Sequence, residues 1–579
     1  MGASHTTLAS ASKGVDEGPP ELDGDVLGAY AVEKPLFPAS GRMMRTFQLR
    51  HKQNLSTIVL KTMMVTSDVE KTVTKQQEEL KRIQTALKGQ HHVAPFLFWN
   101  TGNYKPKPGS STMVRQIHLL RPHTYTTLSD RLASRPFLTH VEKLWISFQI
   151  LEALDTMHSA NVVHGFLTTE NIGLSSWNWV VLVDFASYKA RTALPDDDPS
   201  DYLYYFQELY KNGTDTTPRD KRCYLAPERF FTPKSGEQQQ DRPQPPLTPA
   251  MDIFSAGCVI LETFLNGDRA LDLGDLMEYR NDKSSQTLQQ GLNKIEFSAL
   301  RAACRHMLHL DPAERLSAGS YLERLHASSV LPESFRDVLS PLMNKITHSP
   351  PDARIAIAAA HYYSVVSATV GVSDEEGKRY FEKALGCTMT KLKETDQPEI
   401  GESKQDEAQD QKMEEEKKEE ITDILAETEA LLRKLDSLNF EEDEILSSRR
   451  NPMDSAAAST VETSKVHTRE ERSEISQSSL LIYLQAILST VRYVQRPASK
   501  IVALQLMIRV AKYVTDEARL QRIVPVTITL LNDQDPLVRA SAIEVLSATL
   551  SIVDSFPPSD SKIFPQYIFK RVTHLMTDP

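Results

Sequence analysis

Cysteine is scarce in this chain of 579 residues, which contains four, at positions 223, 258, 304 and 387. None of the four belongs to a C-x-x-C pair, and none has the spacing of zinc ligands. This pattern disfavours a zinc-binding module. The simple interpretation is reduced thiols in a cytosolic protein.

A basic excess is also lacking, because 66 Lys and Arg face 77 Asp and Glu, for a net charge of -11. Such a chain has no surplus of cations to neutralise phosphates, so we expect no nucleic-acid partner. The first 25 residues lack the apolar core of a secretory signal. The apolar stretch 355–372 is interrupted by His361, Tyr362 and Ser364, which favours a buried helix over a membrane span.

The length exceeds that of one hydrophobic core, and shifts in composition divide the chain into five segments. We predict a flexible arm over residues 1–25, an α+β domain over 26–330, the helical start of a solenoid over 331–372, an acidic low-complexity linker with one charged helix over 373–475, and HEAT-type repeats over 476–579.

The α+β assignment depends on the order of the apolar patterns. Strand-like runs near residues 46–49 and 57–64 precede a helical segment at 72–87. Two further segments, 138–158 and 253–265, are apolar nearly all round, as buried helices are, and a short buried strand is predicted at 180–183 between them.

The repeats are predicted from a recurrence with a period of 39 residues. The run that begins Lys500-Ile-Val-Ala503 resembles the run that begins Arg539-Ala-Ser-Ala542. A period near 40 with paired amphipathic helices is typical of HEAT-type solenoids. The sequence shows no evident capping repeat, so we expect the array to be part of a longer one.

Lys61 ends the apolar run Ile58-Val59-Leu60, like the lysine that grips the nucleotide phosphates in protein kinases. Glu78 and Glu79 lie on the predicted helix that follows, and either could hold Lys61. The glycine-rich loop that should precede this strand is reduced to Gly41. Bulky residues stand where close backbone approach would favour glycine, so we expect ATP to bind weakly or in an altered pose.

The catalytic loop reads His164-Gly-Phe166-Leu-Thr168-Thr-Glu-Asn171, against H-R-D-L-x-x-x-N in kinases. His164 and Asn171 keep their spacing, but Phe166 stands at the position of the aspartate and Thr168 at that of the lysine often found two residues later. A phenyl ring cannot accept a proton or orient a hydroxyl group. The sequence therefore predicts no intact catalytic residue.

Asp184 begins the run Asp-Phe-Ala, which matches D-F-G with alanine for glycine, thirteen residues after Asn171. Asp184 and Asn171 could together hold one magnesium ion. Equally, the two side chains could serve only as structural hydrogen-bonding groups. Mg²⁺, like ATP, is therefore an expected cofactor whose binding is weak or altered.

Three further residues match parts that build the kinase fold. Glu228 belongs to an A-P-E motif, Asp252 begins a D-x-W-S-x-G-like helix, and Arg315 follows Asp311-Pro-Ala-Glu. We expect Arg315 to pair with Glu228. Six kinase motifs in the right order, with His164 in the catalytic loop, predict a bilobal protein-kinase-like domain.

Several runs resemble one family in particular, the vacuolar-protein-sorting-fifteen family. These runs are Ser176-Trp-Asn-Trp179, Val183-Asp-Phe-Ala-Ser187, Cys223-Tyr-Leu-Ala-Pro-Glu-Arg-Phe230 and Met251-Asp-Ile-Phe-Ser-Ala-Gly-Cys-Val-Ile260. The resemblance covers the kinase-like domain and the helical part, but not the acidic linker. Members of the family usually keep the catalytic aspartate that Phe166 replaces here.

The resemblance implies the protein-kinase-like regulatory subunit of class III phosphatidylinositol 3-kinase. Expected partners are the lipid-kinase catalytic subunit, a beclin-type subunit and small GTPases, on the cytoplasmic side of endosomal and autophagic membranes. The opening Met-Gly2-x-x-x-Thr fits N-myristoylation of Gly2, which would supply a weak membrane anchor. The family also has a C-terminal WD-repeat propeller that nothing here resembles, so we expect a fragment, a short isoform or an incomplete gene model.

Three functions are consistent with the sequence. The first is a regulatory pseudokinase and scaffold of a lipid-kinase complex. The second is an active ATP-dependent serine/threonine kinase in which Glu170 or a substrate group replaces the missing base. The third is a nucleotide switch, in which Lys61 and Asp184 hold ATP or GTP without turnover.

Overall fold

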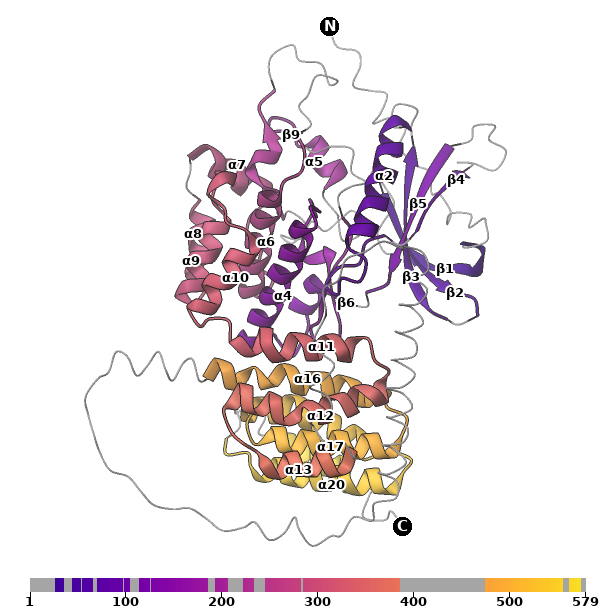
Figure 1. Cartoon of the computed structure of the whole chain (residues 1–579), viewed down its shortest axis with the longest axis vertical. Helices are drawn as coiled ribbons and strands as arrows, with labels where there is room; N and C mark the ends of the chain where they lie inside the picture. The colour runs from indigo at the N-terminus through magenta and orange to yellow at the C-terminus, as the bar shows by residue number, and fades with distance from the viewer. Residues whose placement is uncertain are drawn as a thin grey trace, which may run out of the picture. The chain divides into compact units, whose positions relative to one another are not determined.

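A computed structural model describes residues 27–35, 44–53, 55–65, 70–96, 98–104, 114–124, 126–185, 193–206, 222–233, 245–282, 285–385, 474–555 and 562–573 (Figure 1). The chain divides into two compact units, Met1–Leu331 and Pro332–Pro579. Gly2, Gly41 and the charged helix expected within the acidic linker lie outside the described residues.

The first unit begins with a five-stranded antiparallel sheet in the order β1-β2-β3-β5-β4. Its strands are β1 (Tyr30–Pro35), β2 (Met44–His51), β3 (Thr57–Val65), β4 (Phe98–Tyr104) and β5 (Val114–Pro122). Helix α2 (Glu70–Ala86) follows β3, and Leu80, Ile83 and Leu87 are buried at helical spacing. The register places Lys61 of β3 opposite Thr46 of β2 and Leu119 of β5.

The rest of the first unit is mainly helical. Its helices are α3 (Leu128–Leu132), α4 (His140–Ser159), α5 (Ser200–Tyr205), α6 (Pro249–Phe264), α7 (Leu273–Asp282), α8 (Gln286–Asn293), α9 (Ser298–Met307) and α10 (Ala318–Ala327). A small sheet of β6 (Thr126–Thr127), β7 (Ile172–Leu174) and β8 (Val180–Leu182) and a parallel pair of β9 (Leu194–Pro195) with β10 (Phe230–Phe231) accompany them. The predicted α+β class is confirmed.

Helices α4 and α6 form the centre of this helical part. A capping box begins α4, because the Thr139 side chain accepts from the Glu142 amide and the Glu142 carboxylate accepts from the Thr139 amide. Both helices are buried on nearly every face, and they pack against each other and against α10 and α9 respectively. The all-round apolar pattern of the two segments is explained by this burial.

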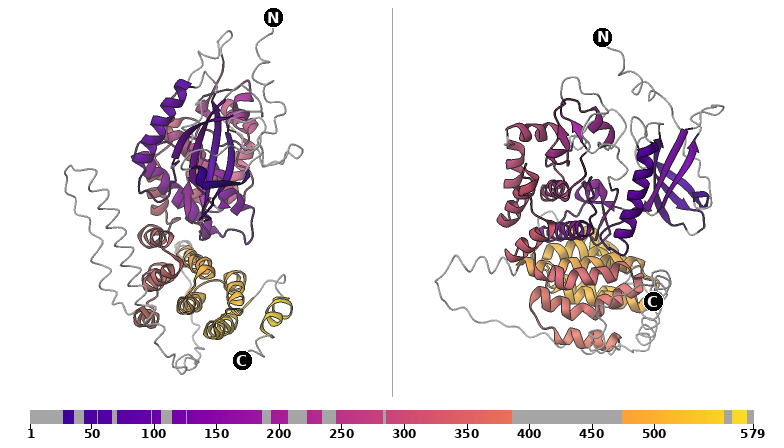
Figure 2. Two further views of the ribbon diagram at one scale, coloured as in Figure 1. Left: turned by 90° about the vertical axis from the view of Figure 1, so that its right-hand side faces the viewer. Right: turned by 45° about the horizontal axis from the view of Figure 1, so that its top comes forward.

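The second unit is helical throughout its described part. It contains α11 (Ser340–Thr347), α12 (Pro351–Val370), α13 (Glu375–Leu385), α16 (Leu480–Thr490), α17 (Pro497–Ala511), α18 (Asp516–Ala518), α19 (Val524–Leu530), α20 (Pro536–Ser551) and α21 (Phe569–Val572). Figure 2 shows most of the longer helices nearly end-on in its left view, so their axes run roughly parallel. The apolar stretch expected as a buried helix forms α12.

The 39-residue recurrence falls on two helices that pack together, α17 and α20. Each has proline as its first residue, Pro497 and Pro536, and both Ala503 and Ala542 are buried. The two copies therefore occupy equivalent places in successive helices. An all-helical solenoid is confirmed in this respect, whereas its assignment to the HEAT type stays a prediction.

The structure differs from the expected start of the linker at residue 373. Helix α13 occupies residues 375–385 and packs on α12. The reason is an aromatic contact between Phe381 and Tyr362, with ring centroids 5.1 Å apart, and a 2.6 Å hydrogen bond from the Tyr362 hydroxyl to Asp374. These contacts extend the folded helices by one more element.

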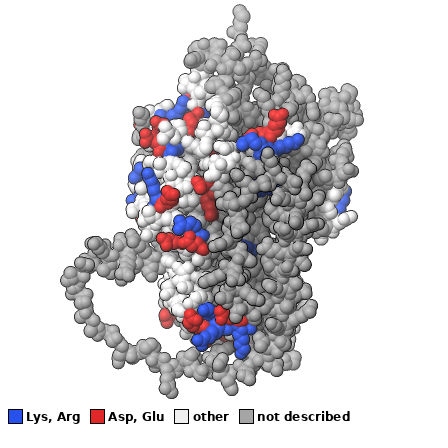
Figure 3. Space-filling view, viewed as in Figure 1, with Lys and Arg blue, Asp and Glu red and all other residues white. Residues whose placement is uncertain are grey.

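None of the helices in the described ranges is long and apolar enough to cross a membrane. On the face of Figure 3, the coloured basic and acidic side chains lie beside one another. Within the described residues, Cys223, Cys258 and Cys304 are free thiols in the core, and burial raises the pKa of Cys223 to about 11.

Candidate active site

Three charged side chains meet where the five-stranded sheet faces the helical part of the first unit. Lys61 comes from β3, Arg121 from β5, and Asp184 follows β8. Arg121 pairs with Val59 in the register, two residues before Lys61, so the alternation of strand side chains directs Arg121 and Lys61 to the same face. The sheet thereby positions two cations together.

Asp184 is bound by both cations. The Lys61 ammonium group lies 2.7 Å from Oδ2, while Nε and Nη2 of Arg121 donate to Oδ1 and Oδ2 at 2.7 and 3.1 Å. All three side chains are buried. The pair formed with Arg121 has the bidentate geometry that makes guanidinium–carboxylate contacts strong.

The charge of Asp184 is fixed by these neighbours. Burial alone would raise the pKa of Asp184, but Arg121 and Lys61 hold the pKa well below its ordinary value. The carboxylate is therefore ionised at neutral pH. Asp184 also has a φ of 63°, a left-handed conformation that is uncommon for residues other than glycine and is concentrated at functional sites.

The two expected partners of Lys61 lie on α2. Glu79 accepts hydrogen bonds from Arg82 at 2.7 and 2.8 Å, and Glu78 is exposed. The structure therefore shows Lys61 with Asp184 and Glu79 with Arg82. A contact between Lys61 and either glutamate stays a prediction.

The catalytic loop is anchored by α6 and by the strand before Asp184. The Asp252 carboxylate accepts from the backbone amides of His164 and Gly165, both at 2.7 Å. The His164 ring lies 2.9 Å from the Val183 carbonyl and stacks on Phe185, with centroids 4.8 Å apart. These contacts give the loop the fixed path of a kinase catalytic loop.

Phe166 occupies the position where a kinase has its aspartate, and this residue is only 5% exposed. Its ring contacts Phe206, which follows α5, edge-on with centroids 5.3 Å apart. Arg229 in turn lies over Phe206 and donates to the Gly165 carbonyl at 3.0 Å. Phe206, which lies between Asp184 and Glu228 in the chain, therefore covers the Phe166 ring with aromatic carbon.

Asn171 and Thr168 are engaged within the loop itself. The Asn171 Nδ2 donates to the Phe166 carbonyl at 2.9 Å, and the Asn171 amide donates to Thr168 Oγ1 at 3.2 Å. These contacts use the nitrogens of Asn171, whereas the oxygens of Asp184 are already bound by two cations, so Asp184 as it stands does not fit a magnesium ion. No group of three or more His, Cys, Asp or Glu side chains in the described residues gathers as a metal site.

The structure brings Arg315 and Glu228 together, as the motifs lead one to expect. The Arg315 guanidinium donates to both Glu228 oxygens at 2.7 and 2.9 Å and also to the Ala250 carbonyl. The pair joins the A-P-E segment to the start of α6, and it supports the loop that precedes the helix.

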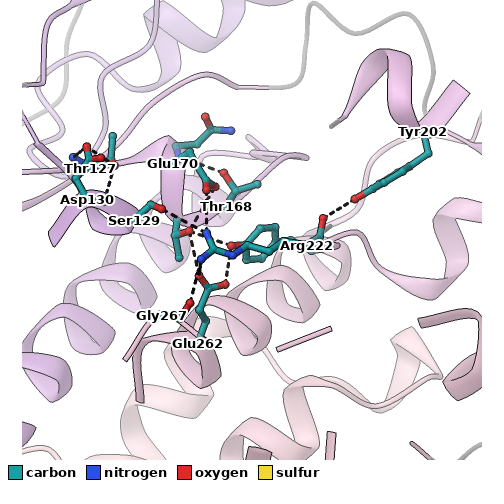
Figure 4. Close-up of polar contacts among 12 residues, drawn as sticks. Thr127, Ser129, Asp130, Thr168, Glu170, Tyr202, Arg222, Glu262 and Gly267 are labelled. Atoms are coloured by element: carbon teal, nitrogen blue, oxygen red, sulfur yellow. Dashed lines mark hydrogen bonds and ion pairs between the residues drawn. The ribbon is translucent and has the colours of Figure 1, made fainter. Parts of the chain in front are cut away.

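A second charged cluster joins the catalytic loop to α6 (Figure 4). Arg222 lies 3.1 Å from Glu170 and 3.1 Å from Glu262, and the Tyr224 hydroxyl donates to Glu262 at 2.6 Å. Burial raises the pKa of Glu262 to about 8, and the nearby Glu170 acts in the same direction while Arg222 opposes it. The cluster fixes residues 222–224 against the loop.

Sequence reasoning missed Arg121, Arg222 and Glu262. A signal existed for two of them: Arg121 ends the apolar run Ile117-His-Leu-Leu120, and Glu262 directly follows the apolar run Cys258-Val-Ile-Leu261. A charge at such a place requires a buried partner. The partners themselves come from distant parts of the chain, so the sequence did not name them.

The sheet, the helical part and the loops between them define a protein-kinase fold. The model of the protein kinase domain matches residues 39–326, and the model described as the PIK3R4-like middle domain matches residues 483–579. Serine/threonine-protein kinase VPS15 of Arabidopsis thaliana is 31% identical over 552 residues, which make up 93% of this chain and 34% of that protein. This chain belongs to the VPS15 family.

Two fungal relatives agree with this assignment. Vps15 of Schizosaccharomyces pombe is 31% identical over 470 residues, covering 80% of this chain and 25% of that protein. VPS15 of Saccharomyces cerevisiae is 29% identical over 471 residues, covering 80% and 29%. The chain thus spans about a third or less of the length of these relatives.

Proposed function

We propose that this chain is a regulatory, kinase-like subunit of the class III phosphatidylinositol 3-kinase complex and that it does not transfer phosphate itself. Membership of the VPS15 family supports the regulatory role. The observation that carries the non-catalytic part is the buried Phe166 ring, which packs edge-on against Phe206 where a carboxylate is required.

The helical unit supports a scaffolding role. Stacked helices expose broad faces, and several large apolar side chains on α20 and near α21 are exposed, namely Leu537, Ile543, Tyr567 and Phe569. The partners we propose are the lipid-kinase catalytic subunit, a beclin-type subunit and small GTPases. The place of action we propose is the cytoplasmic surface of endosomal and autophagic membranes.

Co-purification tests this proposal. The full chain with a C-terminal affinity tag, expressed in eukaryotic cells, should recover a phosphatidylinositol 3-kinase in near-equal amount, identified by mass spectrometry and by lipid-kinase activity. An unrelated kinase-fold protein with the same tag is the control. Clean recovery of the chain without a lipid kinase would overturn the proposed role.

The membrane contact is proposed to depend on a myristoyl group on Gly2. A single acyl chain binds membranes only marginally, so a Gly2→Ala variant should move from the membrane fraction to the supernatant when the partners are absent. Mass spectrometry of the N-terminal peptide reports the acyl group directly. An unmodified Gly2 with unchanged membrane binding would remove this part of the proposal.

An active serine/threonine kinase is the second candidate. Lys61, His164, Asn171 and Asp184 are all present, and Lys61 contacts Asp184 as expected of a phosphate-binding pair. Phosphoryl transfer depends largely on positioning and electrostatic stabilisation, so a replaced base does not alone abolish it. ATP and Mg²⁺, bound weakly, would be the cofactors of this candidate.

A further inference from the structure

Arg121 links the five-stranded sheet to Asp184 in a way that no kinase motif requires. It is the next-to-last residue of strand β5, and its Nη1 donates to the carbonyl of Pro122, the last residue of the strand, at 3.1 Å. Its remaining contacts go to Asp184, one guanidinium nitrogen on each carboxylate oxygen. The side chain is therefore held by both the Pro122 carbonyl and the Asp184 carboxylate.

The charges at this place leave little for a metal ion. Asp184 carries one negative charge, whereas Lys61 and Arg121 carry two positive charges within hydrogen-bonding distance, in a buried environment. A magnesium ion needs carboxylate oxygens at about 2.0–2.1 Å in near-octahedral geometry, with several waters retained. Here it would have to displace a bidentate guanidinium and approach two cations where repulsion is weakly screened.

The second expected ligand, Asn171, cannot replace the carboxylate. Asn171 lies in the catalytic loop with its amide nitrogen on the Phe166 carbonyl. This contact orients the amide group for the loop. The metal-binding atom of Asn171 would be Oδ1, which this contact does not use, but one amide oxygen without the shared carboxylate of Asp184 lacks the paired oxygens that bridge a metal to phosphates.

We infer that Arg121 takes the place of the divalent cation at Asp184, so that this site has no requirement for Mg²⁺, whether or not a nucleotide is bound. The guanidinium supplies the positive charge and connects the sheet to the segment after β8. The catalytic-site residues thus form a permanent internal ion triad, Lys61–Asp184–Arg121. This inference concerns metal use alone, and it stands apart from the partner assignment tested by co-purification.

Thermal unfolding of the full wild-type chain tests the inference. The melting temperature is measured with millimolar ATP or GTP under two conditions. The first contains about 5 mM EDTA, which sequesters Mg²⁺, and the second contains excess MgCl₂. The inference predicts the same melting temperature with and without the metal for each nucleotide, whether nucleotide raises it or not. A nucleotide-dependent rise seen only with MgCl₂ would overturn it.

Substitution of Arg121 is the complementary arm. Arg121→Met removes the internal cation and leaves Asp184 with Lys61, so the melting temperature should fall by roughly 5–15 °C and part of the loss should be recovered on adding MnCl₂ or MgCl₂ with ATP. Arg50→Met is the matched control, because Arg50 lies on the same sheet and pairs with Glu33 at the surface. Its melting temperature should change little and should not respond to metal.

A conservative variant covers the case in which Arg121→Met fails to fold. Arg121→Lys keeps the charge but loses the bidentate contact. It should remain insensitive to metal, and its melting temperature should lie between those of the wild type and Arg121→Met. A rise in melting temperature on adding metal that is as large in Arg121→Lys as in Arg121→Met would contradict the role given to the charge.

Discussion

Phe166 does more than replace the catalytic aspartate, because its ring is part of the packing between the catalytic loop and the segment that ends at Glu228. The ring contacts Phe206, over which Arg229 lies. A carboxylate placed here would be surrounded by aromatic carbon and would lose hydration. Restoring an aspartate at this position would therefore require the covering segment to move.

The burial of Phe166 predicts its contribution to stability. Phe166→Ala should lower the free energy of unfolding by about 3–5 kcal/mol, because a large buried ring leaves a cavity. Phe137→Ala is the control, since the Phe137 side chain is 54% exposed and should change the value by less than about 0.5 kcal/mol. Urea unfolding followed by fluorescence gives both numbers, and equal small changes would show that the ring is not packed.

Glu262 predicts a pH dependence. Its pKa is raised from 4.5 to about 8 in the folded chain, so its contribution to stability is fully present below about pH 4.5 and is lost as the pH rises through about 8. Glu262→Gln should remove this slope, which is at most about 1.4 kcal/mol per pH unit. Urea midpoints at several pH values between 5 and 8 test it, with the exposed Glu323→Gln as the control. A wild-type slope retained in Glu262→Gln would contradict the assignment.

In helix α4, a local capping motif and a long-range hydrogen bond involve the same side chain. Its capping box fixes the first turn, and the same Glu142 carboxylate accepts from Asn178 Nδ2 at 3.0 Å, just before β8. The helix start is thereby tied to the strand that leads to Asp184. The position of Asp184 thus depends on an element that carries no chemistry itself.

This tie predicts the effect of a cap substitution. Thr139→Ala should destabilise the first unit by about 1 kcal/mol, because an N-cap hydrogen bond is lost. Thr156→Ala, on the same helix, removes only a hydroxyl that donates to the Glu152 carbonyl at 2.9 Å and should cost less. Equilibrium unfolding of the two variants compares them, and an equal cost would argue against the capping box.

Elements were easier to predict than side-chain partners. The apolar periodicities located β3, α2, α4, β8 and α6 within a few residues, and motif spacing placed His164, Asn171 and Asp184 in one region. The partners of Asp184 could not be predicted, because the meeting of Lys61 with Arg121 is set by the register of β3 on β5. Helix α13 was missed because its charged surface resembles the acidic stretch that follows.

The whole molecule combines a kinase-fold unit with a helical unit of the VPS15 family. In the first unit, Asp184 is bound by two cations, and Phe166 at the catalytic position belongs to the aromatic packing. The unit thus has the kinase fold with an aromatic ring in place of the catalytic carboxylate. We therefore expect its contribution to a complex to be structural.

Phosphate transfer from γ-labelled ATP shows directly whether the kinase-fold unit is catalytic. The purified full chain is incubated with MgCl₂ and general protein substrates, beside the isosteric Asp184→Asn variant and a known active kinase. We expect no incorporation by the wild type above that of Asp184→Asn. Incorporation by the wild type that disappears in Asp184→Asn would show a working kinase and overturn the non-catalytic role.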